Sequence, residues 1–260
     1  KVIGLTGTPD DGKKDKALFY EQYCPIVYRY LDSAKDGIIN KRKYIVFEYE
    51  LDNNFQIEVK TKFKSWKSGE KKYYDYIQSQ INKGEKLIRE ILEVSDDEYV
   101  NYFGYAQAWY FNRISSKEKK HAGGVYMRGV TARQELLWNL NSTAFLAQRL
   151  AFHIQDMYKD SKVLVFSSRT EQAEKISKYC VHSKNTSEIN SSYLAKFNSG
   201  NIKQLGSCYS LTLGLNLKNA GFAIMESYNG SDVQFKQRSG RLDRLPVDED
   251  AVITFIVVKK

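Results

Sequence analysis

The chain has 260 residues, a length that can bury a substantial hydrophobic core and that allows one elaborated domain or two small ones. Its hydrophobic content of 42% is ordinary for a globular protein, and no stretch approaches the ~20 uninterrupted apolar residues of a membrane-spanning helix. The 40 Lys and Arg residues exceed the 31 Asp and Glu residues, giving a formal charge of +9 that favours polyanionic partners. Composition therefore predicts a soluble protein without a membrane partner.

The cysteines and histidines do not form a recognisable metal or disulfide pattern. The cysteines are odd in number, widely separated and outside any C-x-x-C pair: Cys24, Cys180 and Cys208. The histidines are equally scattered: His121, His153 and His182. We expect no metal site built by the chain, and a reducing cytoplasm as its location.

The first fifty residues contain the beginnings of a sheet. Val2–Thr6 is a short apolar run that Gly7-Thr8-Pro9 ends, as expected of a buried strand. Further strands are expected at Ile26–Tyr30 and Lys43–Leu51, with a short helix at Leu31–Asp36. The chain begins within a strand and has neither an initiator Met nor a signal peptide, so we expect sequence upstream of it.

The middle of the chain has helical periodicity. Apolar residues recur at three-to-four spacing from about Trp66 to Ser116, and Tyr99–Ile114 forms an aromatic second helix in this stretch. His121-Ala122-Gly123-Gly124 is interpreted as a break. Thr131–Tyr158 is then expected to be one long helix with Thr131 as its N-cap.

The last hundred residues alternate between apolar strands and helices, which predicts an α/β fold with a mostly parallel sheet flanked by helices on both faces. The expected strands are Lys162–Phe166, Cys180–His182, Gln204–Cys208, Gly221–Glu226 and Ala251–Val258, and the expected helices are Glu171–Tyr179, Ile189–Phe197 and Val233–Arg238.

Four segments in this frame resemble motifs of superfamily 2 helicases, in the family's order. Gly4–Pro9 (GLTGTP) resembles motif III, Val163–Arg169 (VLVFSSR) motif IV, Leu211–Asn216 (LTLGLN) motif V, and Gln237–Arg244 (QRSGRLDR) motif VI. Motif VI is the most specific because it fixes five positions. The resemblance implies the RecA-like (P-loop NTPase-like) fold of a helicase C-terminal domain.

Motif VI also has a physical meaning without the family. Arg238, Arg241 and Arg244 recur at spacings of three, and Gly240 allows close approach of the backbone, so that guanidinium forks can face a triphosphate. The alternative is a surface helix with salt bridges, which the nearby Asp243 would favour.

The resemblance assigns the nucleotide-facing roles. Arg241 would contact the γ-phosphate, Arg244 would be the arginine finger, and Gln237 would help hold the cleft between two domains. The cofactor-binding residues would be Gly214, Asn216 and Arg238. Considered alone, Gly214 and Asn216 are equally compatible with an ordinary turn.

The resemblance also assigns nucleic-acid contacts and coupling. The nucleic-acid-binding residues would be Ser167, Ser168, Arg169, His182, Cys208 and Thr212. Thr6 and Thr8 would couple the ATP site to nucleic-acid binding. Ser167-Ser168 before a helix is also compatible with a simple N-cap.

The chain lacks the motifs that hold ATP and Mg²⁺ directly. It contains neither G-x-x-x-x-G-K-[ST] nor a D-E-x-H or D-E-x-D box, which in the family precede motif III. We expect residues 1–22 to be the last strand and exit of a first RecA-like domain, and residues 23–260 to be the second, with a helical insertion at about 66–118. ATP with Mg²⁺ would be bound mainly by the missing first domain, and these residues alone should not hydrolyse ATP.

The choice between DNA and RNA rests on resemblance. Gln237 stands where DEAD-box RNA helicases have His, which argues against that family. Phage branch-migration helicases and restriction-enzyme motor subunits are instead resembled by three segments: Gly214–Ala220, Pro25–Tyr28 and Asp36–Ile39. This favours an ATP-dependent DNA translocase of phage or viral origin, acting in the host cytoplasm. The alternatives are an RNA helicase, a non-catalytic nucleic-acid-binding RecA-like module, and an insertion that binds a protein partner.

Overall fold

The computed structural model describes residues 41–60, 64–93, 104–114, 116–208, 217, 219–227, 238, 242 and 249–259. The elements expected at Val2–Thr6, Ile26–Tyr30 and Leu31–Asp36 lie outside these residues, as does most of the helix expected at Val233–Arg238. Contacts divide the chain into two compact units: unit 1, made of Lys1–Tyr49 and Thr143–Lys260, and unit 2, Glu50–Ser142. In the described part of the chain, no helix has the length and apolar character needed to cross a membrane.

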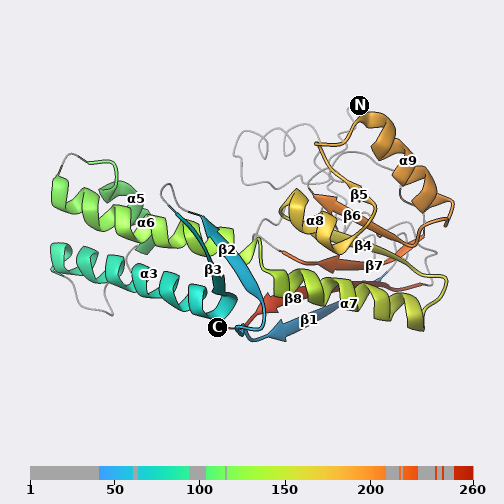
Figure 1. The fold of residues 1–260 in the computed structure, drawn as a ribbon, viewed down its shortest axis with the longest axis horizontal. Helices are drawn as coiled ribbons and strands as arrows, with labels where there is room; N and C mark the ends of the chain where they lie inside the picture. Colours follow the sequence, from blue (N-terminus) through green and yellow to red (C-terminus); the bar gives the residue numbers. More distant parts are fainter. Residues whose placement is uncertain are drawn as a thin grey trace, which may run out of the picture. The chain divides into compact units, whose positions relative to one another are not determined.

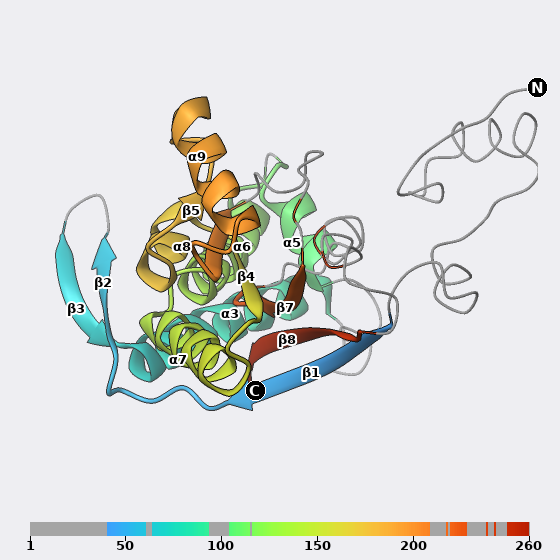
Figure 2. The same cartoon turned by 90° about the vertical axis from the view of Figure 1, so that its right-hand side faces the viewer.

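Unit 1 contains a six-stranded sheet in which every neighbouring pair is parallel (Figure 1), and this confirms the predicted α/β class. The strand order is β1-β8-β7-β4-β6-β5. The strands are β1 (Arg42–Tyr49), β4 (Lys162–Ser167), β5 (Cys180–Val181), β6 (Gln204–Cys208), β7 (Ala220–Met225) and β8 (Ala251–Val258). β1 lies beside β8 although the two strands are at opposite ends of the described sequence (Figure 2).

The central strand β4 is buried on both faces, which explains its continuous apolar sequence. Val163 and Val165 belong to a cluster with Ala147 and Ala151 of α7 (Asn141–Met157) and with α8 (Thr170–Ile176). Leu164, like Phe166, belongs to the other main cluster, which contains Phe197 of α9 (Ser187–Asn198). Alternate residues of one strand therefore fill two cores, as the two-residue period of a strand requires.

The described residues of unit 2 form a hairpin and three helices. Strands β2 (Gln56–Lys60) and β3 (Ser65–Gly69) pair antiparallel, and the helices are α3 (Glu70–Leu92), α5 (Gly104–Phe111) and α6 (Lys117–Leu137) (Figures 1 and 2). The helical assignment from Trp66 was wrong in its first residues, because Trp66 pairs with Val59 in the hairpin and the helix begins at Glu70. Such pairing is a tertiary signal that helical periodicity does not contain.

The predicted break at His121–Gly124 and the predicted N-cap at Thr131 were both wrong. α6 runs without interruption from Lys117 to Leu137, and the expected long helix is divided, since α7 begins at Asn141. Gly123 marks close packing rather than a break. A Cβ there would lie 2.5 Å from the Ala108 carbonyl oxygen and 2.7 Å from the Asn112 nitrogen, so its absence lets α5 approach α6.

The adjacent glycines Gly123 and Gly124 provide a matched test of this packing. Gly123→Ala should lower the free energy of unfolding by about 1–3 kcal/mol, because its methyl group meets backbone atoms that cannot move aside. Gly124→Ala should be neutral or stabilising by up to ~1 kcal/mol, since alanine favours a helix interior. Its nearest neighbours are side-chain ends at 3.3 Å and 3.4 Å. Urea unfolding of the 260-residue chain measures both; equal effects would contradict the packing role of Gly123.

Candidate functional site

The carboxyl ends of the parallel strands in unit 1 gather the described candidate residues at one edge of the sheet. Ser167 ends β4 and is in register with Cys208, which ends β6. His182 directly follows β5, and Glu226 directly follows β7. Open α/β sheets bind their ligands outside this edge, so the candidate site lies where the fold class places it.

A buried carboxylate ties two helices to this edge. The Thr143 hydroxyl, at the start of α7, donates to Glu226 Oε1 at 2.8 Å, and the Gln172 side-chain amide of α8 donates to the same oxygen at 3.2 Å. Glu226 is 1% exposed. Burial raises the pKa of Glu226, although hydrogen bonding by Thr143, Ser227, Gln172 and Ser167 opposes the shift.

A second network joins the ends of β4 and β7 to motif VI. The Ser168 backbone N–H donates to Ser227 Oγ at 2.7 Å, and the Ser227 hydroxyl donates to Ser168 Oγ at 2.9 Å. Arg238 Nη1 lies 3.4 Å from the Ser227 carbonyl oxygen, and the guanidinium carbon lies 5.6 Å from the centre of the Phe166 ring. Leu242 is fully buried in the same cluster as Phe166. Motif VI is thus attached to unit 1 at Arg238 and at Leu242.

His182 and Cys208 are buried beside this edge. His182 Nε2 lies 3.1 Å from Glu174 Oε1, and the His182 carbonyl accepts a hydrogen bond from Asn190 Nδ2 at 3.1 Å. Burial raises the pKa of the Cys208 thiol, and burial raises that of Cys180 to about 12. Both thiols are therefore protonated at neutral pH. The described part of the chain contains no group of three His, Cys, Asp or Glu residues that could hold a metal ion.

The structure brings some of the predicted site residues together and does not describe others. Those outside the described residues are Thr6, Thr8, Thr212, Gly214, Asn216, Gln237, Arg241 and Arg244, whose roles stay predictions. The side chains of Ser167, Ser168, His182 and Cys208 are buried, whereas Arg169 is half-buried. Arg169, not either serine, is the N-cap residue of α8. Ser168 therefore links the ends of β4 and β7, and the predicted contacts of both serines with nucleic acid stay predictions.

Four residues of the two networks were not predicted as site residues: Thr143, Gln172, Glu226 and Ser227. A sequence signal existed for Glu226 and Ser227, because they follow the apolar strand β7 just as Ser167 and Ser168 close β4. No local signal existed for Thr143 and Gln172. Their bonds to Glu226 span 83 and 54 residues of sequence.

Comparisons with known proteins agree with this geometry. Residues 145–246 match the family model described as helicase conserved C-terminal domain. The DNA 3'-5' translocase XPB2 of Sulfurisphaera tokodaii is 27% identical over 270 residues, which cover 99% of this chain and 52% of that protein. The chain thus spans about half the length of this curated relative.

The fold of this chain is similar to that of a solved ATPase structure. The crystal structure of the C-terminal part of the Fun30 ATPase domain has a TM-score of 0.54 at 13% identity, over 85% of this chain and 87% of that one. The parallel sheet of unit 1 is accordingly the RecA-like fold of a helicase C-terminal domain.

The buried carboxyl of Glu226 should give the stability of the chain a characteristic pH dependence. Because folding raises its pKa above the usual 4.5, the unfolded chain releases this proton first as pH rises. The free energy of unfolding should then fall with a slope of up to about 1.4 kcal/mol per pH unit, until pH passes the folded pKa. Glu226→Gln keeps the acceptor for Thr143 and Gln172 but removes this titration, so it should gain stability relative to the unsubstituted chain as pH rises above 4.5.

Urea unfolding across that pH range measures the effect, and Glu58→Gln is a control of opposite sign. Glu58 is exposed, and the Ser65 hydroxyl lowers its pKa, so its contribution is present at neutral pH and lost as pH falls. Glu58→Gln should therefore lose a little stability at neutral pH. Parallel curves for Glu226→Gln and the unsubstituted chain would contradict the assignment.

Proposed function

We propose, from the premise that residues 145–246 form a superfamily 2 helicase C-terminal domain, that the chain is the C-terminal motor half of an ATP-dependent DNA translocase or helicase. In this proposal it supplies arginine side chains to an ATP site completed by another RecA-like domain. It also supplies contacts to nucleic acid.

The observation that carries the proposal is the attachment of motif VI to the carboxyl edge of the sheet. Arg238 is 3% exposed, with its guanidinium on the Ser227 carbonyl and over the Phe166 ring. Leu242, four residues later, is buried in the core. A segment held at these two points is suited to presenting neighbouring residues in a fixed place, and catalysis by positioned charges needs such preorganisation.

The chemistry that we assign to the chain is electrostatic. Mg²⁺-bound ATP supplies the phosphoryl group that is transferred to water, and the chain has no phosphate loop of its own. Arg241 would bind the γ-phosphate, and Arg244 would stabilise the charge that develops during transfer, with Gln237 holding the interface between domains. Arg238, which already has partners within unit 1, would position this segment.

DNA is proposed over RNA because the relative that matches nearly the whole chain is named a DNA translocase. The nucleic-acid contacts would come from motifs IV and V and from the strand end at His182. Since such motors grip mainly the phosphate backbone, the same residues would serve an RNA motor, which is the alternative.

The finger assignment is tested by ATP turnover of the full-length parent protein with and without DNA. Arg244→Ala should lower the DNA-stimulated kcat by roughly a thousandfold, because an arginine finger is worth about 10³ or more in rate. Arg149→Ala, an exposed arginine on α7, removes the same charge from unit 1 and should leave turnover unchanged. Unchanged turnover in Arg244→Ala would remove the finger assignment.

A non-catalytic binding module is the second candidate, and nucleotide dependence separates it from a motor. We expect the full-length parent to change its affinity for DNA when a non-hydrolysable ATP analogue is added, because ATP bridges the two motor domains. Titrations with single-stranded DNA, duplex DNA and RNA at two salt concentrations measure this. A steep salt dependence with no nucleotide effect on any of them would favour the binding module.

A further inference from the structure

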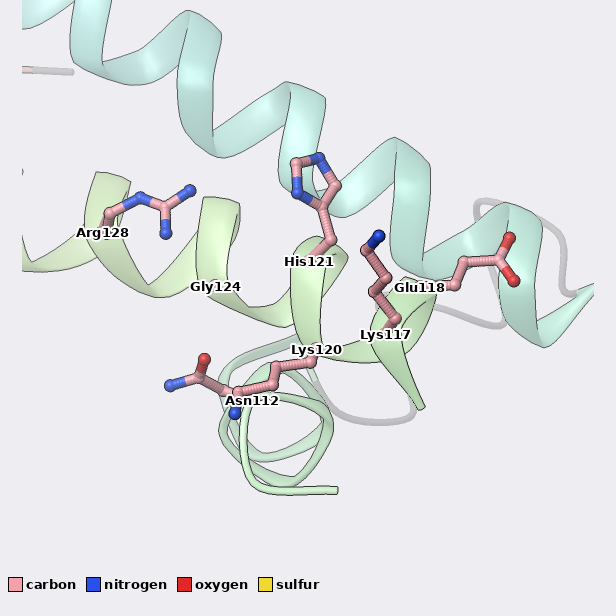
Figure 3. Close-up of a pocket in the computed structure, with 7 residues that line it drawn as sticks. All are labelled: Asn112, Lys117, Glu118, Lys120, His121, Gly124 and Arg128. Atoms are coloured by element: carbon pink, nitrogen blue, oxygen red, sulfur yellow. The ribbon is translucent and has the colours of Figure 1, made fainter. Parts of the chain in front are cut away.

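Unit 2 contains a groove between α5 and α6 (Figure 3) that none of the motor motifs explains. A hollow of about 740 Å³ is lined by Asn112, Lys117, Glu118, Lys120, His121, Gly124 and Arg128. A second hollow of about 410 Å³ shares Asn112, Gly124 and Arg128 with it and continues along α6 to Glu135. We call the two together the α5–α6 groove.

The α5–α6 groove is positively charged. The stretch from Arg113 to Arg128 contains five Lys and Arg residues and a single acidic residue, Glu118. The side chains of Lys117, Lys120 and Arg128 are exposed and form no hydrogen bond or ion pair with other described residues. The groove lining contains Lys117, Lys120 and Arg128 against Glu118 and Glu135, and such an excess of cations attracts a polyanion and raises its rate of encounter.

The floor of the groove is kept open by a glycine. A Cβ at Gly124 would lie 3.3 Å from Arg128 Nη1 and 3.4 Å from Asn112 Oδ1. In Figure 3, Arg128 and Asn112 flank the bare backbone at Gly124. Gly123 lets α6 pack closely against α5, whereas Gly124 leaves room between the polar side chains of Arg128 and Asn112.

Exposed aromatic rings lie on α5, the helix that leads to the groove residue Asn112. Tyr105, Trp109 and Asn112 are spaced i, i+4, i+7, which places them along one edge of the helix that Asn112 continues. Tyr105 is 55% exposed and Trp109 is 47% exposed. The Arg113 guanidinium carbon lies 3.5 Å from the centre of a Trp109 ring, which adds a cation beside this platform.

We propose that the α5–α6 groove binds single-stranded nucleic acid. Lys117, Lys120 and Arg128 contact its phosphates, and unpaired bases stack on Trp109 and Tyr105. Positive grooves that follow a backbone, edged by exposed aromatic rings, bind single strands in this way. A protein partner fits less well, because the cores of protein interfaces are depleted of charged residues. The site goes beyond the proposed motor function, since it requires neither ATP nor motif VI.

Fluorescence anisotropy of the 260-residue chain, without nucleotide, tests the charges of the groove with labelled single-stranded DNA, single-stranded RNA and duplex DNA. The double variant K120A/R128A should bind single strands about tenfold more weakly, and its log–log salt slope should be shallower by ~0.7 per lost phosphate contact. The control K67A/K72A removes two exposed charges from β3 and α3 of the same unit. It should bind as the unsubstituted chain does.

The aromatic edge is tested on the same helix. Trp109→Ala should weaken single-strand binding about tenfold, and Trp109→Phe should restore most of it, because stacking needs only a ring. Tyr110→Ala is the matched control, since Tyr110 is equally exposed, at 55%, but lies off the groove edge. Circular dichroism of each variant checks that α5 and α6 are folded.

The outcomes separate this site from the motor. Equal binding by K120A/R128A and K67A/K72A, or binding of duplex alone without an effect of Trp109→Ala, would overturn the proposal. Loss of single-strand binding in the groove variants supports it whatever Arg244→Ala does to ATP turnover in the parent. Conversely, unchanged ATP turnover in Arg244→Ala would not change the interpretation of the anisotropy measurements.

Discussion

The parallel pairing of β4 with both β6 and β7 is the constraint on which unit 1 depends. Parallel strands all end at one edge, so this pairing places Ser167 in register with Cys208 and Phe166 in register with Met225. The residues that follow β4 and β7 then meet, as the hydrogen bonds between Ser168 and Ser227 show. Without that register, Arg238 would have neither the Ser227 carbonyl nor the Phe166 ring to hold it.

The buried Glu226 has a cost and a structural consequence. A carboxyl group taken out of water is unfavourable, and its raised pKa reflects that penalty. Its hydrogen bonds to Thr143 and Gln172 fix the start of α7 and the side of α8 against the end of β7. Hydrogen bonds between buried groups are strong in a low dielectric, so the bonds of Thr143 and Gln172 to Glu226 Oε1 restrict how α7 and α8 can move against the end of β7. Glu226 therefore supports the geometry on which the proposed function depends.

The centre of the sheet of unit 1 could be predicted from the sequence because a strand such as β4 is buried on both faces. A continuous apolar run such as Val163–Phe166 has few other interpretations in an alternating α/β pattern, and β4, β6 and β8 lie where that pattern predicts. The motif positions at strand ends could likewise be predicted. Which of those side chains are buried could not be predicted, because burial depends on distant residues, such as Ser227, which is hydrogen-bonded to Ser168.

Unit 2 was harder to predict for a definite physical reason. Glycine lowers helix propensity, so Gly123-Gly124 favoured a break. Its effect on packing depends on the partner helix α5, whose Ala108 carbonyl occupies the space that a side chain at Gly123 would need. The hairpin was missed similarly, since Val59 and Trp66 reveal their pairing only in three dimensions. In both cases tertiary contact overrode a local preference.

The two candidate surfaces differ in a way that matches the tasks proposed for them. At the carboxyl edge of unit 1, Ser168, Glu226 and Arg238 are buried and hydrogen-bonded, which gives fixed geometry. In the α5–α6 groove, Lys120 and Arg128 are exposed and unpaired with other described residues, which gives charge without fixed geometry. Phosphoryl transfer depends on placing charges to within a fraction of an ångström, whereas holding a strand by its phosphates tolerates many positions and sequences. The fixed geometry of the carboxyl edge therefore suits the proposed role in phosphoryl transfer. The exposed charges of the α5–α6 groove suit the proposed binding of nucleic acid without sequence preference.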